Sequence, residues 1–189
     1  MSSSSIFSSS LSSLLLVFLI ITPSLADQTS PNDIVNTVCS KDSNPDFCLM
    51  VLPLSSGQTL EGLAKIFINL VYSNAVYAVN RLNEAAKGTS DPQLKQKYSF
   101  CSNNISNAVK AIAEAQKLLS TSGNFSGLGS AATTTTAEAE KCLAILEKIL
   151  HDPLNLLRSV VFLEQYADTV KVISIEFMQY FSNIPMKES

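Results

Sequence analysis

Apolar positions recur with a helical period over most of this chain. The clearest segment follows Asp91-Pro92, where apolar side chains recur every three or four residues as far as Leu119. This spacing places them on one face of an α-helix. Gly123 ends the pattern, since glycine readily terminates helices, and a second periodic segment starts near Ser126. Two long helices joined by so short a loop are expected to lie antiparallel.

Two more long segments have the same period. One starts after Thr59, a good N-cap residue, and ends at Lys87-Gly88. The other starts at Asp152-Pro153 and fades at Asn183-Ile184-Pro185. No strand-like alternation extends over a comparable length. The sequence therefore predicts an all-α protein with an up-and-down four-helix bundle over residues 58–183.

Two short helices are predicted before this bundle. Ser30-Pro31 and Asn44-Pro45 each combine a capping residue with a proline suited to the first helical turn. Helices this short are not stable alone, and Cys39 and Cys48 are placed to link them. We therefore predict a disulfide-linked helical hairpin over residues 27–57.

Residues 1–26 have the features of a secretory signal peptide. The apolar run Leu14–Ile21 is too short to span a membrane, and Ser24-Leu25-Ala26 supplies the small residues of a cleavage site. The alternative is an uncleaved anchor, but no flanking Lys or Arg would fix its orientation. We predict cleavage after residue 26 and secretion, with no membrane attachment afterwards.

Charge and cysteine content narrow the class of protein. The formal net charge is −3, and the absence of a Lys/Arg cluster argues against a nucleic-acid partner. Four cysteines follow the predicted signal, and an even number in a secreted chain indicates disulfides, with three possible pairings. Cys39 and Cys48 are close in sequence, whereas Cys101 and Cys142 lie on the inward stripes of adjacent helices. Pairing within each couple is the simplest choice. A metal site is the alternative, but the chain has no CxxC motif and one histidine.

The sequence offers little support for catalysis. Hydrolysis needs a nucleophile with a base, or paired carboxylates in a cleft. The one histidine, His151, falls at the predicted end of a helix, where its charge is favourable. Glu138 and Glu140 fall on different helical faces and are interpreted as solvated charges. No phosphate loop, HExxH or GxSxG motif is present. We predict a binding protein with no catalytic residue, cofactor or metal.

Two tripeptides match the N-glycosylation motif: Asn104-Ile105-Ser106 and Asn124-Phe125-Ser126. Asn124 falls in a predicted loop and is the favoured acceptor. Asn104 falls in the middle of a helix, where a glycan requires that face to be open. Either match is also compatible with chance.

A run of four threonines, Thr133–Thr136, falls inside the third long helix. β-Branched residues are mediocre helix formers, and their hydroxyls can bond to the preceding turn and bend the helix. The run is either a tolerated, partly exposed turn or part of a polar contact surface.

Several short motifs accompany the cysteine pattern. They are Asn44-Pro45-Asp46-Phe47-Cys48-Leu49, Asp91-Pro92-Gln93-Leu94-Lys95, Tyr98-x2-Cys101, Ala108-x3-Ile112-x2-Ala115 and Ser130-Ala131-Ala132. Together they resemble the plant invertase/pectin methylesterase inhibitor family over essentially the whole mature chain. The resemblance implies a four-helix bundle with an N-terminal hairpin, and disulfides between the first and second and the third and fourth cysteines.

The resembled family contains two classes of inhibitor. One class covers the acidic cleft of pectin methylesterase, mainly with the second and third long helices and part of the fourth. The other inserts a Pro-Lys-Phe segment into the active site of an acid invertase. Here that place is taken by Gly123–Gly127, without Pro-Lys-Phe. The resemblance therefore implies a secreted inhibitor of pectin methylesterase in the cell wall (apoplast). Acid invertase is the alternative target, and a secreted, non-inhibitory helical bundle is the alternative from another class.

One helical face is the candidate surface for the target enzyme. The family tends to carry a tyrosine and acidic groups on the second long helix, but this chain has Ile105, Asn107 and Lys110 there. Polar residues recur on the face of this helix away from Cys101, and the threonine run adds two more. The candidate surface comprises Ser99, Asn103, Asn107, Lys110, Thr133 and Thr136. Such a rigid surface laid over a cleft would block substrate entry, with a low ordering cost on binding. The alternative is that these side chains are merely solvated.

Overall fold

The computed structural model describes residues 31–52, 59–149, 152 and 154–182. The predicted signal peptide and His151 lie outside these residues. All regular secondary structure within them is helical. The helices are α1 (Pro31–Ser40), α2 (Pro45–Val51), α3 (Leu60–Gly88), α4 (Pro92–Ser122), α5 (Ser126–Leu146) and α6 (Leu156–Ser182).

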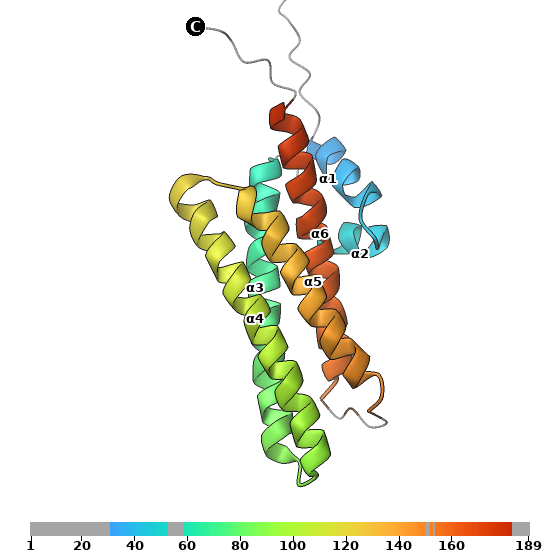
Figure 1. Cartoon of the computed structure of the whole chain (residues 1–189). Helices are drawn as coiled ribbons and strands as arrows, with labels where there is room; N and C mark the ends of the chain where they lie inside the picture. Colours follow the sequence, from blue (N-terminus) through green and yellow to red (C-terminus); the bar gives the residue numbers. More distant parts are fainter. Residues whose placement is uncertain (1–30, 53–58, 150–151, 153, 183–189) are drawn as a thin grey trace, which may run out of the picture. The chain divides into compact units, whose positions relative to one another are not determined.

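The four long helices form the bundle that the sequence predicts. Helix α3 packs against α4 and α6, and α5 packs against the same two helices (Figure 1). Consecutive long helices run in opposite directions, as expected from their short connections. Each helix contributes large, fully buried apolar side chains to one core, including Phe67, Leu63, Leu82, Ile105, Ile112, Leu128, Leu163 and Ile173. Burying each such side chain contributes about 1.5–3 kcal/mol, so the core provides most of the driving force for folding.

Three predicted helix ends are confirmed, each with a local cause. Thr59 Oγ1 accepts a hydrogen bond from the Gly62 N–H at 3.0 Å and caps α3. Asp91 Oδ1 accepts from the Gln93 N–H at 2.8 Å and caps α4. Gly123 ends α4 in the left-handed conformation, with φ of 59°, which glycine adopts without a steric penalty.

The predicted connection between α5 and α6 is wrong in its position. Helix α5 ends at Leu146 instead of near residue 150, and α6 starts at Leu156 instead of at Asp152-Pro153. Asn155 has a positive φ of 50°, which is incompatible with a helix beginning at Asp152. The Asp152 side chain still serves the helix, because its Oδ2 accepts from the Leu157 N–H at 2.8 Å.

Helix α5 continues without interruption through the threonine run. Thr133 donates its hydroxyl to the carbonyl of Gly129, and Thr135 donates to that of Ala131, each at 2.8 Å. These bonds within the helix satisfy hydroxyls that would otherwise compete with the helical pattern. The fully buried Thr135 is accommodated in the core for this reason.

The two short N-terminal helices pack against each other and against α6. Cys39 and Cys48 form a disulfide between them, with Cα atoms 5.4 Å apart. The Phe47 ring packs against Phe162 and Tyr166 of α6, at centroid distances of 5.8 and 5.1 Å. The hairpin is therefore held by a covalent link and by aromatic packing on the bundle.

Within the described residues, α3 alone is long and apolar enough to cross a membrane, judged by length and composition. Its apolar stripe includes Phe67, Val71, Ala75 and Leu82, all buried. That stripe packs against α4 and α6, so these residues form part of the bundle core.

Candidate functional site

A disulfide fixes the two helices that carry the candidate surface. Cys101 of α4 and Cys142 of α5 are bonded, with Cα atoms 4.8 Å apart, and neither side chain is exposed. This pairing agrees with the one that the sequence predicts. Because α4 and α5 also share an extensive apolar contact, their outward faces keep a fixed relative position.

Helix α4 presents a polar stripe, defined here as Ser99, Asn103, Asn107 and Lys110. The last three side chains are exposed, and Ser99 is half-buried. Spacings of three and four residues place them on one side of the helix. The opposite side contains the buried residues Cys101, Ile105, Ala108 and Ile112. The sequence-based division of α4 into an inward and an outward face is thus correct.

The two threonines of the candidate surface have different environments. Thr133 is exposed on α5. Thr136 is half-buried, and its hydroxyl donates to Asp168 Oδ1 of α6 at 3.3 Å. Thr136 therefore belongs to the α5–α6 contact, and Thr133 is the residue of the pair that faces outward. Sequence spacing alone does not separate them, because it does not say where α6 lies.

Sequence reasoning missed an acidic group between α5 and α6. Glu140 of α5 and Glu147, which follows the last residue of α5, lie near Glu164 of α6, and Asp168 lies on the same helix as Glu164. Burial raises the pKa of Glu164 above its ordinary value, and the charges of Asp168, Glu140 and Glu147 raise it further. Glu140 is thus more than an isolated solvated charge. The i, i+4 spacing of Glu164 and Asp168 was the available signal, but the contribution of α5 required the packing of the two helices.

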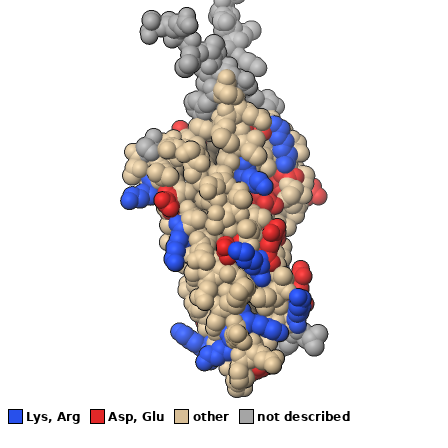
Figure 2. Space-filling view, in the orientation of Figure 1, with Lys and Arg blue, Asp and Glu red and all other residues tan. Residues whose placement is uncertain are grey.

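The charges of this molecule are mixed in sign. On the face shown in Figure 2, Lys/Arg and Asp/Glu side chains are interspersed with uncharged surface. Some are paired along a helix, as where Lys141 donates to Glu138 at 2.8 Å on α5.

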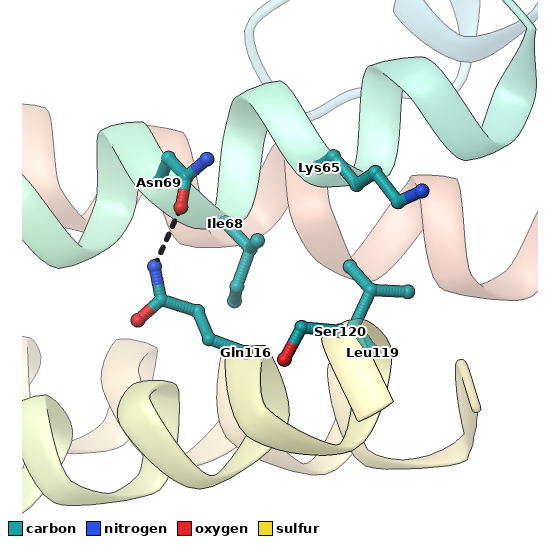
Figure 3. A pocket seen from close by; sticks show the side chains of 6 residues that line it. All are labelled: Lys65, Ile68, Asn69, Gln116, Leu119 and Ser120. Atoms are coloured by element: carbon teal, nitrogen blue, oxygen red, sulfur yellow. Dashed lines mark hydrogen bonds between the residues drawn. The ribbon is translucent and has the colours of Figure 1, made fainter. Parts of the chain in front are cut away.

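A shallow depression of about 210 Å³ lies between α3 and α4 (Figure 3). Its floor is formed by Ile68 and Leu119, and Gln116 donates its side-chain amide to Asn69 across it at 2.7 Å. Ser120 at its edge donates to the carbonyl of Lys117. These polar groups therefore already bond within the protein. The depression also lies on the α3 side of α4, whereas the candidate surface includes α5.

The two asparagines predicted as glycosylation acceptors differ in their exposure. Asn124 is exposed in the α4–α5 connection, and Asn104 is half-buried on α4. No group of three or more His, Cys, Asp or Glu side chains that could hold a metal ion occurs in the part of the chain that the structure describes.

The chain is similar in sequence and in fold to known proteins. The family described as plant invertase/pectin methylesterase inhibitor matches residues 33–174. A protein named "Pectinesterase inhibitor" from Actinidia deliciosa is 32% identical over 168 residues, covering 86% of this chain and 90% of its own. "Pectinesterase inhibitor 1" from Arabidopsis thaliana is 27% identical over 116 residues, covering 61% of this chain and 65% of its own.

Solved structures give the same result for the fold. The crystal structure of a mutant form of a pectin methylesterase inhibitor from Arabidopsis superimposes with a TM-score of 0.69 at 24% identity. The match covers 75% of this chain and 95% of that one. A second crystal structure, of a pectin methylesterase inhibitor from Arabidopsis thaliana, gives a TM-score of 0.59 at 23% identity, covering 77% of this chain and 96% of that one. On the strength of the family match over residues 33–174, the chain belongs to the plant invertase/pectin methylesterase inhibitor family.

Proposed function

We propose that this protein is a secreted inhibitor of pectin methylesterase that blocks the enzyme's substrate cleft by stoichiometric binding. The observation that carries the proposal is the 32% identity to the Actinidia deliciosa pectinesterase inhibitor over 90% of that protein. Because the match covers 86% of this chain and 90% of the relative, the similarity is between the two whole proteins and is not confined to one shared segment. The family consists of inhibitors, so we expect no catalytic activity from the chain itself.

The outward faces of α4 and α5 are the proposed contact surface. Asn103, Asn107 and Lys110 on α4 and Thr133 on α5 are exposed and offer hydrogen-bond donors and acceptors. The Cys101–Cys142 disulfide joins the two helices, so little backbone has to be ordered when a partner binds. Ser99 and Thr136 are half-buried, and we assign them to the margins of this surface.

The alternative target, acid invertase, is less well supported by the α4–α5 connection. Phe125 is the aromatic residue in this connection, and its ring stacks on Phe177 of α6 with centroids 3.6 Å apart. A phenylalanine held against the bundle is not positioned to enter the active site of another protein. The connection also lacks the Pro-Lys-Phe segment associated with invertase inhibition.

An extracellular location fits this function. Disulfides persist in oxidising compartments, and the described residues contain two, with no free cysteine. Pectin methylesterase acts on the cell wall, so inhibitor and enzyme would meet in the apoplast. We propose that residues 1–26 direct the chain there and are removed.

Titration of two enzymes tests the proposal. Secreted, oxidised protein is added in increments to fixed amounts of pectin methylesterase and, separately, of acid invertase. We expect pectin methylesterase activity to fall linearly to an equivalence point at a 1:1 molar ratio, with invertase activity unchanged. Loss of invertase activity alone would instead support the alternative target. Unchanged activity of both enzymes would leave a non-inhibitory bundle. Reduced and alkylated protein is the control for non-specific effects.

A further inference from the structure

We propose that Asn124 carries an N-linked glycan and that Asn104, the other acceptor motif, is unmodified. The proposal does not depend on the identity of the target enzyme. It rests on the different environments of the two asparagine side chains. Both belong to Asn-x-Ser tripeptides, so the motif itself does not distinguish them.

Asn124 has the environment of an acceptor. It follows Gly123, which ends α4, and its side chain is exposed. Its Oδ1 accepts a hydrogen bond from the Ser126 N–H at 2.9 Å. This bond is an Asx turn, and it fixes the carboxamide oxygen toward the backbone. Since the oxygen and nitrogen of a carboxamide diverge from the same carbon, the nitrogen that would bear the glycan is turned away from the backbone.

Asn104 has the opposite environment. It lies in the middle of α4, next to the fully buried Ile105. Its Nδ2 atom is buried, with less than 1 Å² exposed and no hydrogen-bond partner. A glycan is bonded to this same nitrogen, so a modified Asn104 would have to leave its place in the helix packing. The folded bundle is therefore incompatible with a glycan at this position.

The position of the glycan matters for the rest of the molecule. Asn107 and Gly123, the residue that ends α4, lie roughly 24 Å apart along the helix axis, at a rise of 1.5 Å per residue. A glycan at Asn124 would therefore cover the end of the bundle near the α4–α5 connection and leave the Asn103–Asn107 part of α4 open. A glycan at Asn104 would instead stand between Asn103 and Asn107 on the same helix.

Site-specific mass spectrometry tests the proposal. The full chain is secreted from a eukaryotic host and treated with a peptide-N-glycosidase in heavy-oxygen water, which converts each glycosylated asparagine to labelled aspartate. We expect the label at position 124 and none at 104. Ser126→Ala should abolish the glycan, whereas Ser126→Thr and Ser106→Ala should keep it. Label at position 104, or an unmodified secreted wild type, would overturn the proposal. Inhibition is measured separately and has no bearing on occupancy.

Discussion

The hydroxyl of Thr169 on α6 donates a hydrogen bond of 2.6 Å to the carboxylate of Asp42, in the turn between α1 and α2. Both residues are buried, and Asp42 also accepts from the Asn44 N–H at 2.8 Å. On either side of Asp42, Lys41 pairs with Glu176, and Ser43 donates to Asp168. Three consecutive residues of the turn therefore bond to α6, and the turn lies inside the loop closed by Cys39–Cys48.

Loss of the Thr169 hydroxyl should destabilise the protein. In Thr169→Val the carboxylate of Asp42 loses a hydrogen bond but stays buried. Loss of such a bond to a charged acceptor costs about 1.5–3 kcal/mol. We expect a decrease of this size in the free energy of unfolding, measured with urea. Thr133→Val is the matched control, because Thr133 is exposed and bonds only within its own helix, and its effect should stay within about 0.5 kcal/mol. Equal effects of the two substitutions would contradict this account.

The two disulfides should differ in their contribution to stability. Cys101–Cys142 spans 41 residues and Cys39–Cys48 spans 9. In the chain-entropy model the longer loop stabilises by about 4 kcal/mol and the shorter by about 2.5 kcal/mol. We therefore expect the double substitution of Cys101 and Cys142 by alanine to lower the unfolding free energy more than that of Cys39 and Cys48. Guanidinium unfolding of the two variants measures the difference, and the reverse order would show that the loop-length argument fails here.

Helices α5 and α6 approach closely where Gly129 lies opposite Ser174. A Cβ atom at position 129 would lie 2.9 Å from Ser174 Oγ. Alanine in a helix interior is favoured over glycine by about 1 kcal/mol, and here this contact offsets the gain. We expect Gly129→Ala to be neutral or destabilising in the wild type, but stabilising by about 1 kcal/mol when Ser174 is also alanine. A double-mutant cycle of unfolding free energies measures the coupling. Additive effects would exclude the steric explanation.

Glu164 should make the stability depend on pH. Its pKa is raised in the folded state, chiefly by burial and then by Asp168, Glu140 and Glu147. The folded protein therefore binds this proton more tightly than the unfolded chain does, so the stability contributed by Glu164 is complete below its ordinary pKa of 4.5 and is lost as the pH rises through the raised value. Glu164→Gln should then raise the melting temperature at pH 7 by up to about 3 °C, with no gain at pH 3.

The matched control for this experiment is Glu114→Gln, at an exposed position on α4. We expect it to change the melting temperature at pH 7 by less than Glu164→Gln does. A larger gain from Glu164→Gln at pH 3 than at pH 7 would contradict the expected direction of the pH dependence and would exclude the raised pKa of Glu164 as its cause.

The helices were predictable because their signals are local. Thr59, Asp91 and Gly123 act on backbone groups within a few residues, so their roles could be inferred from the sequence. The start of α6 was misplaced because Asp152 resembles an N-cap. The left-handed backbone of Asn155 directly precedes the true start, and an asparagine in the sequence is only a weak signal of that conformation.

The candidate site was predictable only in part, because its details depend on which helices are neighbours. Periodicity places Asn107 and Lys110 on the outward face of α4, and both are exposed. It does not reveal that Thr136 bonds to Asp168, or that Glu140 lies near Glu164, because these pairs join α5 to α6. The bond between Asp42 and Thr169 spans 127 residues and was equally invisible in the sequence.

Large side chains on the proposed contact surface should weaken inhibition without unfolding the protein. Asn107 and Thr133 are exposed on α4 and α5, so tryptophan at both positions can extend into solvent at little cost to stability. If these faces lie against the enzyme, two indole rings would hold the surfaces apart, because a close-fitting interface tolerates added bulk poorly. We expect the double substitution Asn107→Trp with Thr133→Trp to raise the inhibition constant at least about tenfold, equivalent to about 1.4 kcal/mol of binding free energy.

The matched control for this surface is Ser73→Trp, at a position on α3 that is also exposed and lies outside the proposed contact. It should leave the inhibition constant unchanged, and all variants should retain the wild-type melting temperature within a few degrees. Because the Cys101–Cys142 disulfide holds α4 and α5 together, a loss of inhibition confined to the α4–α5 variant would reflect the surface itself. Unchanged potency of this variant would show that the α4–α5 face does not contact the enzyme. Weaker inhibition by Ser73→Trp would instead indicate that α3 contacts it.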